Sequence, residues 1–462
     1  MTLYRGRIDA KYPGLMDEIN RSLPVDIRLL PYDLLTNRAW CAELKRIGIL
    51  TANELKAIQK ALDDVAKMAK DGAFAALPDD EDVHTLVERL LTEKLGETGA
   101  KIHAGRSRND QVVCDLRMYV CDRLADLAEQ AAQLIRTVQK LGKKHAQTLL
   151  AGETHLQPAQ VITLGHFLLA LGGALARDLG RLRDAFSRAN QCPLGSGALA
   201  GSGFPVDRRR LAKMLGFDGV VENTLDAVSD RDFAQEAVFA CALICLHLSR
   251  FAEQFVIWAN PAFGYVRFAD DWSTGSSMMP QKRNPDAMEL IRAKAARCIG
   301  HAAASMSLTK GLPLAYAKDL QEDKPPLFDA LDSAALCLRV FDAALASATF
   351  DAARMKNALS GDLLATDLAD LLVEAGVPFR AAHERVGRLV KDLEKRKKSL
   401  LEVTPAEMKK RFPEIAENSF PLTFENALKR RAVIGGAAPK NVARQIRMLD
   451  EAVAENVLKK RV

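Results

Sequence analysis

A polar stretch between two apolar helical patterns has the composition of a loop that does chemistry. It reads TGSSMMPQKRNP from Thr274 to Pro285. Two prolines resist helix formation and Gly275 permits movement, so the stretch is predicted to be a mobile lid. Its hydroxyl groups can transfer protons, and Lys282 can stabilise a developing negative charge. A solvated connection between helices has a similar composition, so the loop alone does not establish chemistry.

A second polar segment, residues 103–111, stands at the start of a long helical pattern. It contains Arg106 and Arg108 next to Asn109. Arginine side chains at a helix N-terminus suit a carboxylate ligand. Capping by Ser107, Asn109 or Asp110 is the alternative, but capping does not require two arginines.

Three further segments are rich in polar or small residues. Residues 152–160 place His155 in a turn among polar side chains, where it can transfer protons, although a lone histidine is more often structural. Residues 195–202 are glycine-rich but follow no strand, so we predict a turn that lets a ligand approach, not a dinucleotide site. Residues 315–324 offer Tyr316, Gln321 and Lys324, which either bind a polar substrate or are surface residues.

No metal or cofactor site is predicted from residue spacing. The eight histidines form no close ligand pair, and the eight cysteines show no zinc spacing. A phosphate-binding loop is also missing. We therefore expect chemistry by protein side chains alone.

The elements that position these segments are predicted to be mainly α-helices in three domains. The chain has 462 residues and only 6% aromatics, and alternating strand patterns are not evident. We predict an N-terminal helical domain (1–105), a central long-helix bundle (106–354) and a small helical C-terminal domain (355–462). The bundle helices are expected at 112–146, 161–189, 225–259, 286–308 and 327–348. Several look apolar around their circumference, which indicates burial in an oligomer.

Charge and cysteine usage limit the class of protein. The net charge of +6 is spread along the chain, which does not favour nucleic acid as a partner. Residues 1–9 contain no apolar signal core, and apolar runs of membrane-spanning length all contain charges. Eight cysteines in apolar helical patterns are predicted to be buried, reduced thiols. We therefore expect a cytoplasmic protein that binds neither nucleic acid nor membrane.

Taken together, the polar segments resemble the fumarase/aspartase superfamily, whose members release fumarate from succinyl compounds. The loop at 275–285 is similar to the superfamily signature. Within it, the segments at 105–111, 154–157, 225–233 and 314–324 resemble the argininosuccinate lyase/δ-crystallin family. The motif Glu81-Asp-Val-His84 is similar to a family motif near the site. Residues 3–9 and 37–40 depart from the family pattern.

The resemblance implies a fold and an assembly. The subunit would be a three-domain, mainly α, fumarase/aspartase-like protein with a long central bundle. Four subunits would form a homotetramer around a twenty-helix core. Each active site would combine segments of three subunits, which would explain why the polar motifs lie far apart along the chain.

Carried over position by position, the resemblance implies roles for individual residues. Ser276 matches the catalytic serine, His155 the catalytic histidine and Glu289 the carboxylate that pairs with it. Lys282 and Asn284 match residues that hold the succinyl carboxylate. The rest of the substrate-binding set is Ser22, Arg108, Asn109, Thr154, Arg231, Tyr316, Gln321 and Lys324.

The implied reaction is reversible elimination of fumarate from argininosuccinate, which yields arginine and is the last step of arginine biosynthesis. A base removes the proton beside a carboxylate, and an acid protonates the leaving nitrogen. The carbanion-like intermediate needs a cation such as Lys282. We hypothesise that Ser276 takes the proton and His155 supports its return; the reverse assignment stays open.

Three alternatives remain at this point. Another lyase of the superfamily would act on adenylosuccinate or aspartate, but residues 108–111 and 316–324 argue against it. A non-catalytic, crystallin-like structural protein would not need the intact His155, Ser276 and Lys282. A helical scaffold or interaction protein would not need several polar clusters.

Overall fold

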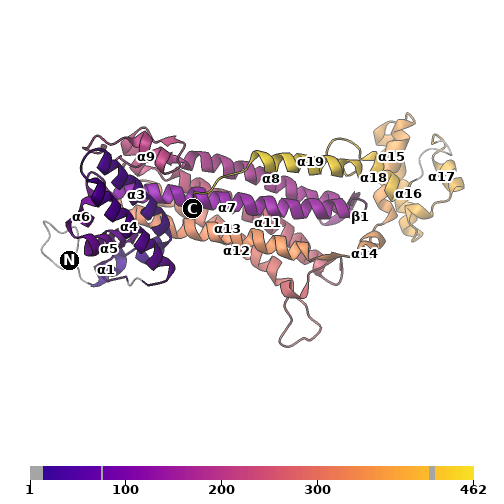
Figure 1. Cartoon of the computed structure of the whole chain (residues 1–462). Helices are drawn as coiled ribbons and strands as arrows, with labels where there is room; N and C mark the ends of the chain where they lie inside the picture. Colours follow the sequence, from indigo (N-terminus) through magenta and orange to yellow (C-terminus); the bar gives the residue numbers. More distant parts are fainter. Residues whose placement is uncertain (1–13, 74–75, 416–421, 462) are drawn as a thin grey trace.

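The computed structural model describes residues 14–73, 76–415 and 422–461. The prediction that no signal core opens the chain, and the departure from the family pattern at 3–9, fall outside these residues. The described chain is mainly helical, as predicted, and forms an elongated molecule with a bundle between two end regions (Figure 1).

The N-terminal region is a cluster of short and medium helices. Thr51 and Glu54 form a capping box at the start of α4, and Asp82 caps α5 by accepting a 2.7 Å hydrogen bond from the Thr85 N–H. The elements are α1 (Gly14–Asn20), α2 (Leu23–Asp26), η1 (Ile27–Leu29), α3 (Leu30–Arg46), α4 (Ala52–Lys70), α5 (Val83–Leu95), α6 (Glu97–Ala100) and η2 (Lys101–His103).

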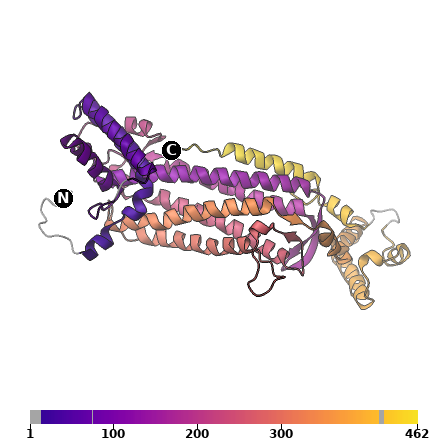
Figure 2. The same cartoon turned by 60° about the horizontal axis from the view of Figure 1, so that its bottom comes forward.

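Five long helices lie side by side and form the bundle (Figures 1 and 2). They are α7 (Arg108–Lys144), α8 (Leu164–Ala189), α11 (Asp232–Ala259), α12 (Asp286–Thr309) and α13 (Lys324–Ala346). With 37 residues, α7 spans about 55 Å at the rise per residue of an α-helix. The bundle therefore separates its two ends by a distance that no side chain can bridge.

The predicted helix 225–259 is two helices. The first, α10, covers Thr224–Ser229, and α11 begins at Asp232. Asp230 is extended, with ψ of 134°, and its carboxylate accepts a 2.6 Å hydrogen bond from the Asp232 N–H. Because this carboxylate also pairs with the buried Arg117, the break fixes an ion pair that a continuous helix would not form.

Two glycines of α8 let neighbouring helices approach closely. A Cβ at Gly165 would lie 2.5 Å from the Gly142 carbonyl oxygen of α7, and one at Gly172 would lie 2.6 Å from a methyl of Leu449, in the C-terminal helix. Gly173 and Gly180, also in α8, meet no such contact.

Three small two-stranded sheets accompany the helices, where the sequence indicated no strands. Their strands are β1 (Leu149–Thr154) with β2 (Gln157–Thr163), β3 (Gln191–Cys192) with β4 (Gly219–Val220), and β5 (Val266–Arg267) with β6 (Thr349–Phe350). The β1–β2 hairpin lacks a clean alternation because Gly152 and Pro158 interrupt it at an irregular register. The remaining short elements are α9 (Arg208–Met214), η3 (Asp270–Trp272) and η4 (Lys318–Asp323).

The C-terminal region has a hydrophobic cluster of its own, between Leu364 and Ala427. Its elements are α14 (Ala352–Asn357), η5 (Gly361–Leu364), α15 (Ala365–Glu374), α16 (Phe379–Lys395), η6 (Leu400–Glu402), α17 (Pro405–Arg411), α18 (Phe424–Arg430) and α19 (Lys440–Glu455). The last helix leaves this cluster and lies along the bundle (Figure 1). The three domain boundaries stay a prediction.

The central helix α11 is unusually apolar. It has the length and composition that a membrane span requires, yet it packs between α8, α12 and α13. Large apolar side chains on three bundle helices nevertheless stay exposed in one chain, namely Phe239, Leu246, Leu290, Ile299, Met306 and Leu336. All eight cysteines are free and buried, as predicted.

Candidate active site

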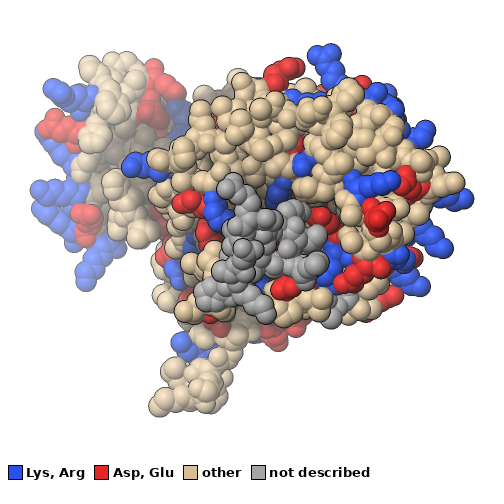
Figure 3. Space-filling model, turned by 90° about the vertical axis from the view of Figure 1, so that its left-hand side faces the viewer, with Lys and Arg blue, Asp and Glu red and all other residues tan. Residues whose placement is uncertain are grey.

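A cavity of about 380 Å³ lies where the N-terminal helices meet the first end of the bundle. Four separate chain segments line it, and six predicted substrate-binding residues are among the lining side chains. These are Ser22, Arg108, Asn109, Tyr316, Gln321 and Lys324. Acidic and basic residues are interspersed on this end face of the molecule (Figure 3).

The start of α7 positions Arg108 and Asn109. Ser107 and Asp110 form a capping box, so the capping alternative is correct for these two residues. The other oxygen of the Asp110 carboxylate accepts 2.9 Å hydrogen bonds from the N–H groups of Gly195 and Gly197. The glycine-rich turn at 195–202 therefore receives a carboxylate of the protein itself, where the sequence indicated a ligand.

The two residues that follow the cap face the cavity with defined partners. Asn109 donates its side-chain amide to the Ala198 carbonyl oxygen over 3.1 Å. Arg108 lies 3.2 Å from the Asp82 carboxylate and donates to the Thr85 hydroxyl over 3.3 Å. Helix capping thus leaves the polar ends of Arg108 and Asn109 at the cavity wall.

Lys324 is buried in the cavity wall among carboxylates. Its ammonium group donates to Asp323 over 3.2 Å and lies 4.0 Å from Asp26. Burial lowers the pKa of Lys324, but Asp323 and Asp26 outweigh it, so the pKa is raised and the side chain stays charged. Arg231 does not line the cavity. It is 3% exposed and pairs with Asp323 from behind.

Sequence reasoning missed Asp26, which lines the same cavity. It is 2% exposed, and one carboxylate oxygen accepts from the Ser22 hydroxyl. The other oxygen is buried without a hydrogen-bond partner among the described residues. Burial raises the pKa of Asp26 to about 6, against the opposing effect of Lys324. The signal was the four-residue spacing from Ser22, which places both on one helix face.

At the cavity wall, three buried side chains from three helices form a hydrogen-bonded group, and His84 is the member that lines the cavity. His84 Nδ1 lies 2.8 Å from Asp33 and 3.4 Å from Asp115. Their ligand atoms are close enough together for a metal ion, a grouping that residue spacing did not indicate. Direct hydrogen bonds already link them, and burial raises the pKa of both carboxyls. His84 Nε2 and one Asp115 oxygen have no hydrogen-bond partner among the described residues. The expectation of no metal stays a prediction.

His155 lies at the tip of the β1–β2 hairpin, together with Thr154. His155 and Leu156 both have left-handed backbone conformations, with φ of 56° and 58°. Such conformations are costly for residues other than glycine and are often kept where function requires them. The hairpin presents His155 and Thr154 to the outside of this chain.

The predicted lid is a projecting loop whose base is closed by the Thr274–Asn284 bridge (Figures 1 and 2). Ser276 Oγ accepts hydrogen bonds from the N–H groups of Met278 and Met279, at 3.2 and 3.0 Å. Two aligned N–H donors on one serine oxygen stabilise negative charge there.

A second cavity, of about 1200 Å³, adjoins the base of this loop. Lys282, Asn284 and Glu289 line it, while Ser276 and His155 do not. Within the described residues, no hydrogen bond links Glu289 to His155, although the resemblance pairs them. The nearest charged contact of Glu289 is Arg292, at 3.8 Å.

One chain therefore divides the predicted site between the two ends of its bundle. Arg108 and Asn109 start α7, while Thr154 and His155 follow its other end. Similarly, Glu289 lies in the first turn of α12, and Tyr316 follows its last turn. The predicted acid/base residues and the cavity lined by the predicted substrate-binding residues therefore cannot meet within a single chain.

Comparison with known proteins places the chain among lyases. A lyase family model matches residues 6–300, and an argininosuccinate lyase C-terminal model matches residues 362–429. Argininosuccinate lyase of Carboxydothermus hydrogenoformans is 45% identical, over 98% of this chain and all of the relative. The enzyme of Desulforudis audaxviator is 46% identical, over 95% and 96% of the two chains.

Solved structures show the same architecture. EDDS lyase in complex with formate is 27% identical, with a TM-score of 0.81 over 97% of this chain and 91% of that chain. A class II fumarase from Schistosoma mansoni has a TM-score of 0.72 at 15% identity, over 85% and 91% of the two chains, which shows the fold alone.

Proposed function

Because the chain belongs to the argininosuccinate lyase family, we propose that it eliminates fumarate from argininosuccinate and releases arginine, as a carbon–nitrogen lyase of arginine biosynthesis. One observation carries the proposal beyond similarity. Six side chains assigned to substrate binding, drawn from distant segments, converge on one cavity.

The charges around this cavity suit the amino-acid end of the substrate. Arg108, Lys318 and Lys324 supply positive charge, while Asp26 and Asp82 supply negative charge. A zwitterionic head group carries one ammonium and one carboxylate, so a wall with both signs can neutralise each of them. We assign the ammonium group to Asp26, whose second carboxylate oxygen makes no hydrogen bond among the described residues and lies 4.0 Å from Lys324.

The acid/base chemistry belongs to the other end of the bundle. We assign proton removal to Ser276, whose oxygen already accepts two backbone N–H groups. Lys282 stabilises the carbanion-like intermediate, and Asn284 holds its carboxylate. For proton removal, Ser276 acts in its deprotonated form. His155, supported by Glu289, donates a proton of its own to the departing nitrogen.

We infer that a homotetramer with a twenty-helix core brings the two ends together. The length of α7 and the exposed apolar side chains of α11, α12 and α13 support this assembly. Chains that pack side by side with ends reversed would place one chain's hairpin and loop over another chain's cavity. The buried thiols support our further proposal that the protein works in the cytoplasm.

The activity is tested by incubating the purified protein separately with argininosuccinate, adenylosuccinate and aspartate, and following fumarate by ultraviolet absorbance. Fumarate from argininosuccinate alone is expected. Release from adenylosuccinate or aspartate alone would assign another lyase of the superfamily. Silence with all three would favour a crystallin-like structural role.

The shared site is tested by mixing two inactive variants, Asn109→Ala and His155→Asn. If each site takes these residues from different chains, co-refolded mixtures regain about one site in four, because each position is filled at random. The control refolds each variant alone and should stay inactive. A mixture without activity would contradict the shared site.

A further inference from the structure

We propose that the C-terminal strap, residues 456–461, is a positioning element of the substrate cavity, with Arg461 as its anchor. The inference rests on the proposed function, because it assigns the strap a role in substrate binding. The strap follows α19 and returns to the end of the bundle where the N-terminal helices lie (Figure 1). No residue of the strap lines the substrate cavity.

The guanidinium of Arg461 is held by several partners at once. It donates to the carbonyl oxygens of Leu215 and Gly216, each over 3.1 Å, and to the side chain of Asn190. Its carbon lies 4.7 Å from the centre of the Phe217 ring, over the aromatic face. A planar guanidinium group with three hydrogen bonds and a stacked ring fixes the end of the strap more strictly than a surface ion pair would.

The contacts with Leu215, Gly216 and Phe217 attach the strap to the α9 lobe, which we define as residues 193–222. The contact with Asn190 attaches it to the end of α8. The same lobe holds the start of α7 from its other side, through the Gly195 and Gly197 N–H groups and the Ala198 carbonyl oxygen. Because Ala198 accepts from Asn109, the position of the lobe sets the orientation of that side chain.

A second path leads from the strap to the N-terminal helices. The backbone N–H of Arg461 donates to one carboxylate oxygen of Asp122 over 2.8 Å, and the Tyr32 hydroxyl donates to the other oxygen over 3.1 Å. Tyr32 stands near the start of α3, a few residues after Ser22 and Asp26 in the chain. Asp122 therefore ties the strap to the segment that supplies one wall of the substrate cavity.

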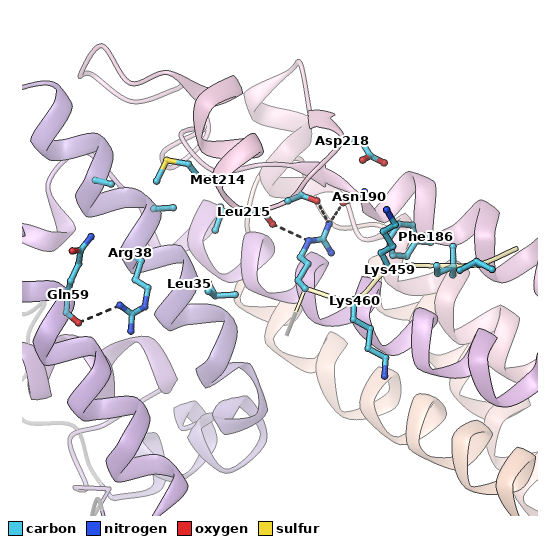
Figure 4. Close-up of a pocket in the computed structure, with 16 residues that line it drawn as sticks. Leu35, Arg38, Gln59, Phe186, Asn190, Met214, Leu215, Asp218, Lys459 and Lys460 are labelled. Carbon is cyan, nitrogen blue, oxygen red and sulfur yellow. Dashed lines mark hydrogen bonds between the residues drawn. The ribbon is translucent and has the colours of Figure 1, made fainter.

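The region beneath the strap is open rather than packed. A cavity of about 720 Å³ separates α3 and α4 from the α9 lobe, and the strap forms its third side (Figure 4). Leu35 and Arg38 line it from α3, while Met214 and Leu215 line it from the lobe. Glu43 and Arg46 of α3 contact residues 205–210 of the lobe directly. The strap adds a second connection between the two sides, through the contacts of Arg461 with Leu215 and Asp122.

The test compares Arg461→Ala with Arg461→Lys and with Lys459→Ala, a matched control at an exposed strap residue. We expect Arg461→Ala to raise KM for argininosuccinate roughly fivefold while kcat changes less than twofold, because a displaced binding residue weakens binding before chemistry. Lysine keeps the positive charge but lacks the planar guanidinium group. The KM of Arg461→Lys should therefore lie between the values of Arg461→Ala and the wild type. Lys459→Ala should match the wild type.

Hydrogen exchange gives a readout that does not need turnover. Arg461→Ala should lose protection both at 193–203 and at 22–36, while the C-terminal cluster at 364–427 keeps it. If Arg461→Ala lowers Tm but leaves KM and protection at both segments unchanged, the strap is only structural and the proposal is wrong. An equal effect of Lys459→Ala would also overturn it. Wild-type protein that releases no fumarate would contradict the proposed function. The hydrogen-exchange result would then test separately whether the strap positions residues 193–203 and 22–36.

Discussion

Arg231 Nε donates a 2.5 Å hydrogen bond to Asp323 Oδ2, joining residues 92 positions apart in the chain. Both side chains are almost fully buried, at 2% and 6% exposure. The other oxygen of Asp323 accepts from Lys324. Arg231 therefore contacts Lys324 in the cavity wall through Asp323, without lining the cavity itself.

Replacing Arg231 with methionine should leave the Asp323 carboxylate buried without its main partner. We expect the free energy of unfolding to fall by about 3–5 kcal/mol, measured by urea denaturation. The control is Arg28→Met, which removes an ion pair with Asp332 that is nearly half exposed and should cost less than about 1 kcal/mol. Equal losses in the two variants would show that the buried pair has no special role.

Ser276→Ala should remove the proton-accepting oxygen of the loop. We expect kcat for fumarate release to fall by about 10²–10⁴, the usual range for a lost acid/base group, with Tm unchanged because the loop is exposed. Ser277→Ala is the matched control and should keep near-normal turnover. If Ser276→Ala stays active while His155→Asn abolishes proton exchange at the reacting carbon, the reverse assignment is correct.

Asp26→Asn should trade substrate binding for stability. The pKa of Asp26 is raised to about 6 in the fold, so the folded state binds more protons than the unfolded state between pH 4 and 6. The ionised carboxylate of Asp26 therefore destabilises the folded protein. The destabilisation is complete above pH 6 and disappears below pH 4. The pKa of Asp26 rises from 3.8 in the unfolded chain to about 6 in the fold, and this difference corresponds to a cost of about 3 kcal/mol.

The measurement is Tm of wild type and Asp26→Asn as a function of pH. The variant should be more stable at pH 8, and the difference should vanish as pH falls from 6 to 4. Its KM for argininosuccinate should rise, because the ammonium group loses an ionic partner. A stability difference that does not depend on pH would show that ionisation of Asp26 is not its cause.

Two glycines of α8 should respond in opposite directions to the same change. Gly165→Ala places a methyl 2.5 Å from the Gly142 carbonyl oxygen and forces α7 and α8 apart, at a cost of about 1–3 kcal/mol. Gly180→Ala meets open space and should stabilise the protein by about 0.5–1 kcal/mol. Tm values that shift in the same direction would contradict the close approach of the two helices.

The sequence alone determined the helical class and most helix positions, and it predicted the site residues. These features rest on local signals. Thr51 and Glu54 cap α4 as their spacing predicts, and Thr404 with Pro405 opens α17. Ser276, Lys282 and His155 stand out because loop motifs keep their chemistry within a few consecutive residues.

Only the tertiary structure decided which of these residues meet. It divided the predicted site residues between two ends of the bundle and placed Arg231 behind Asp323. It also brought Asp26 to the cavity, and Asp33 and Asp115 to the region behind it. It also placed Arg461 on the α9 lobe. These relationships join segments tens to hundreds of residues apart. Burial and long-range packing create them, and periodicity or local spacing carries no record of either.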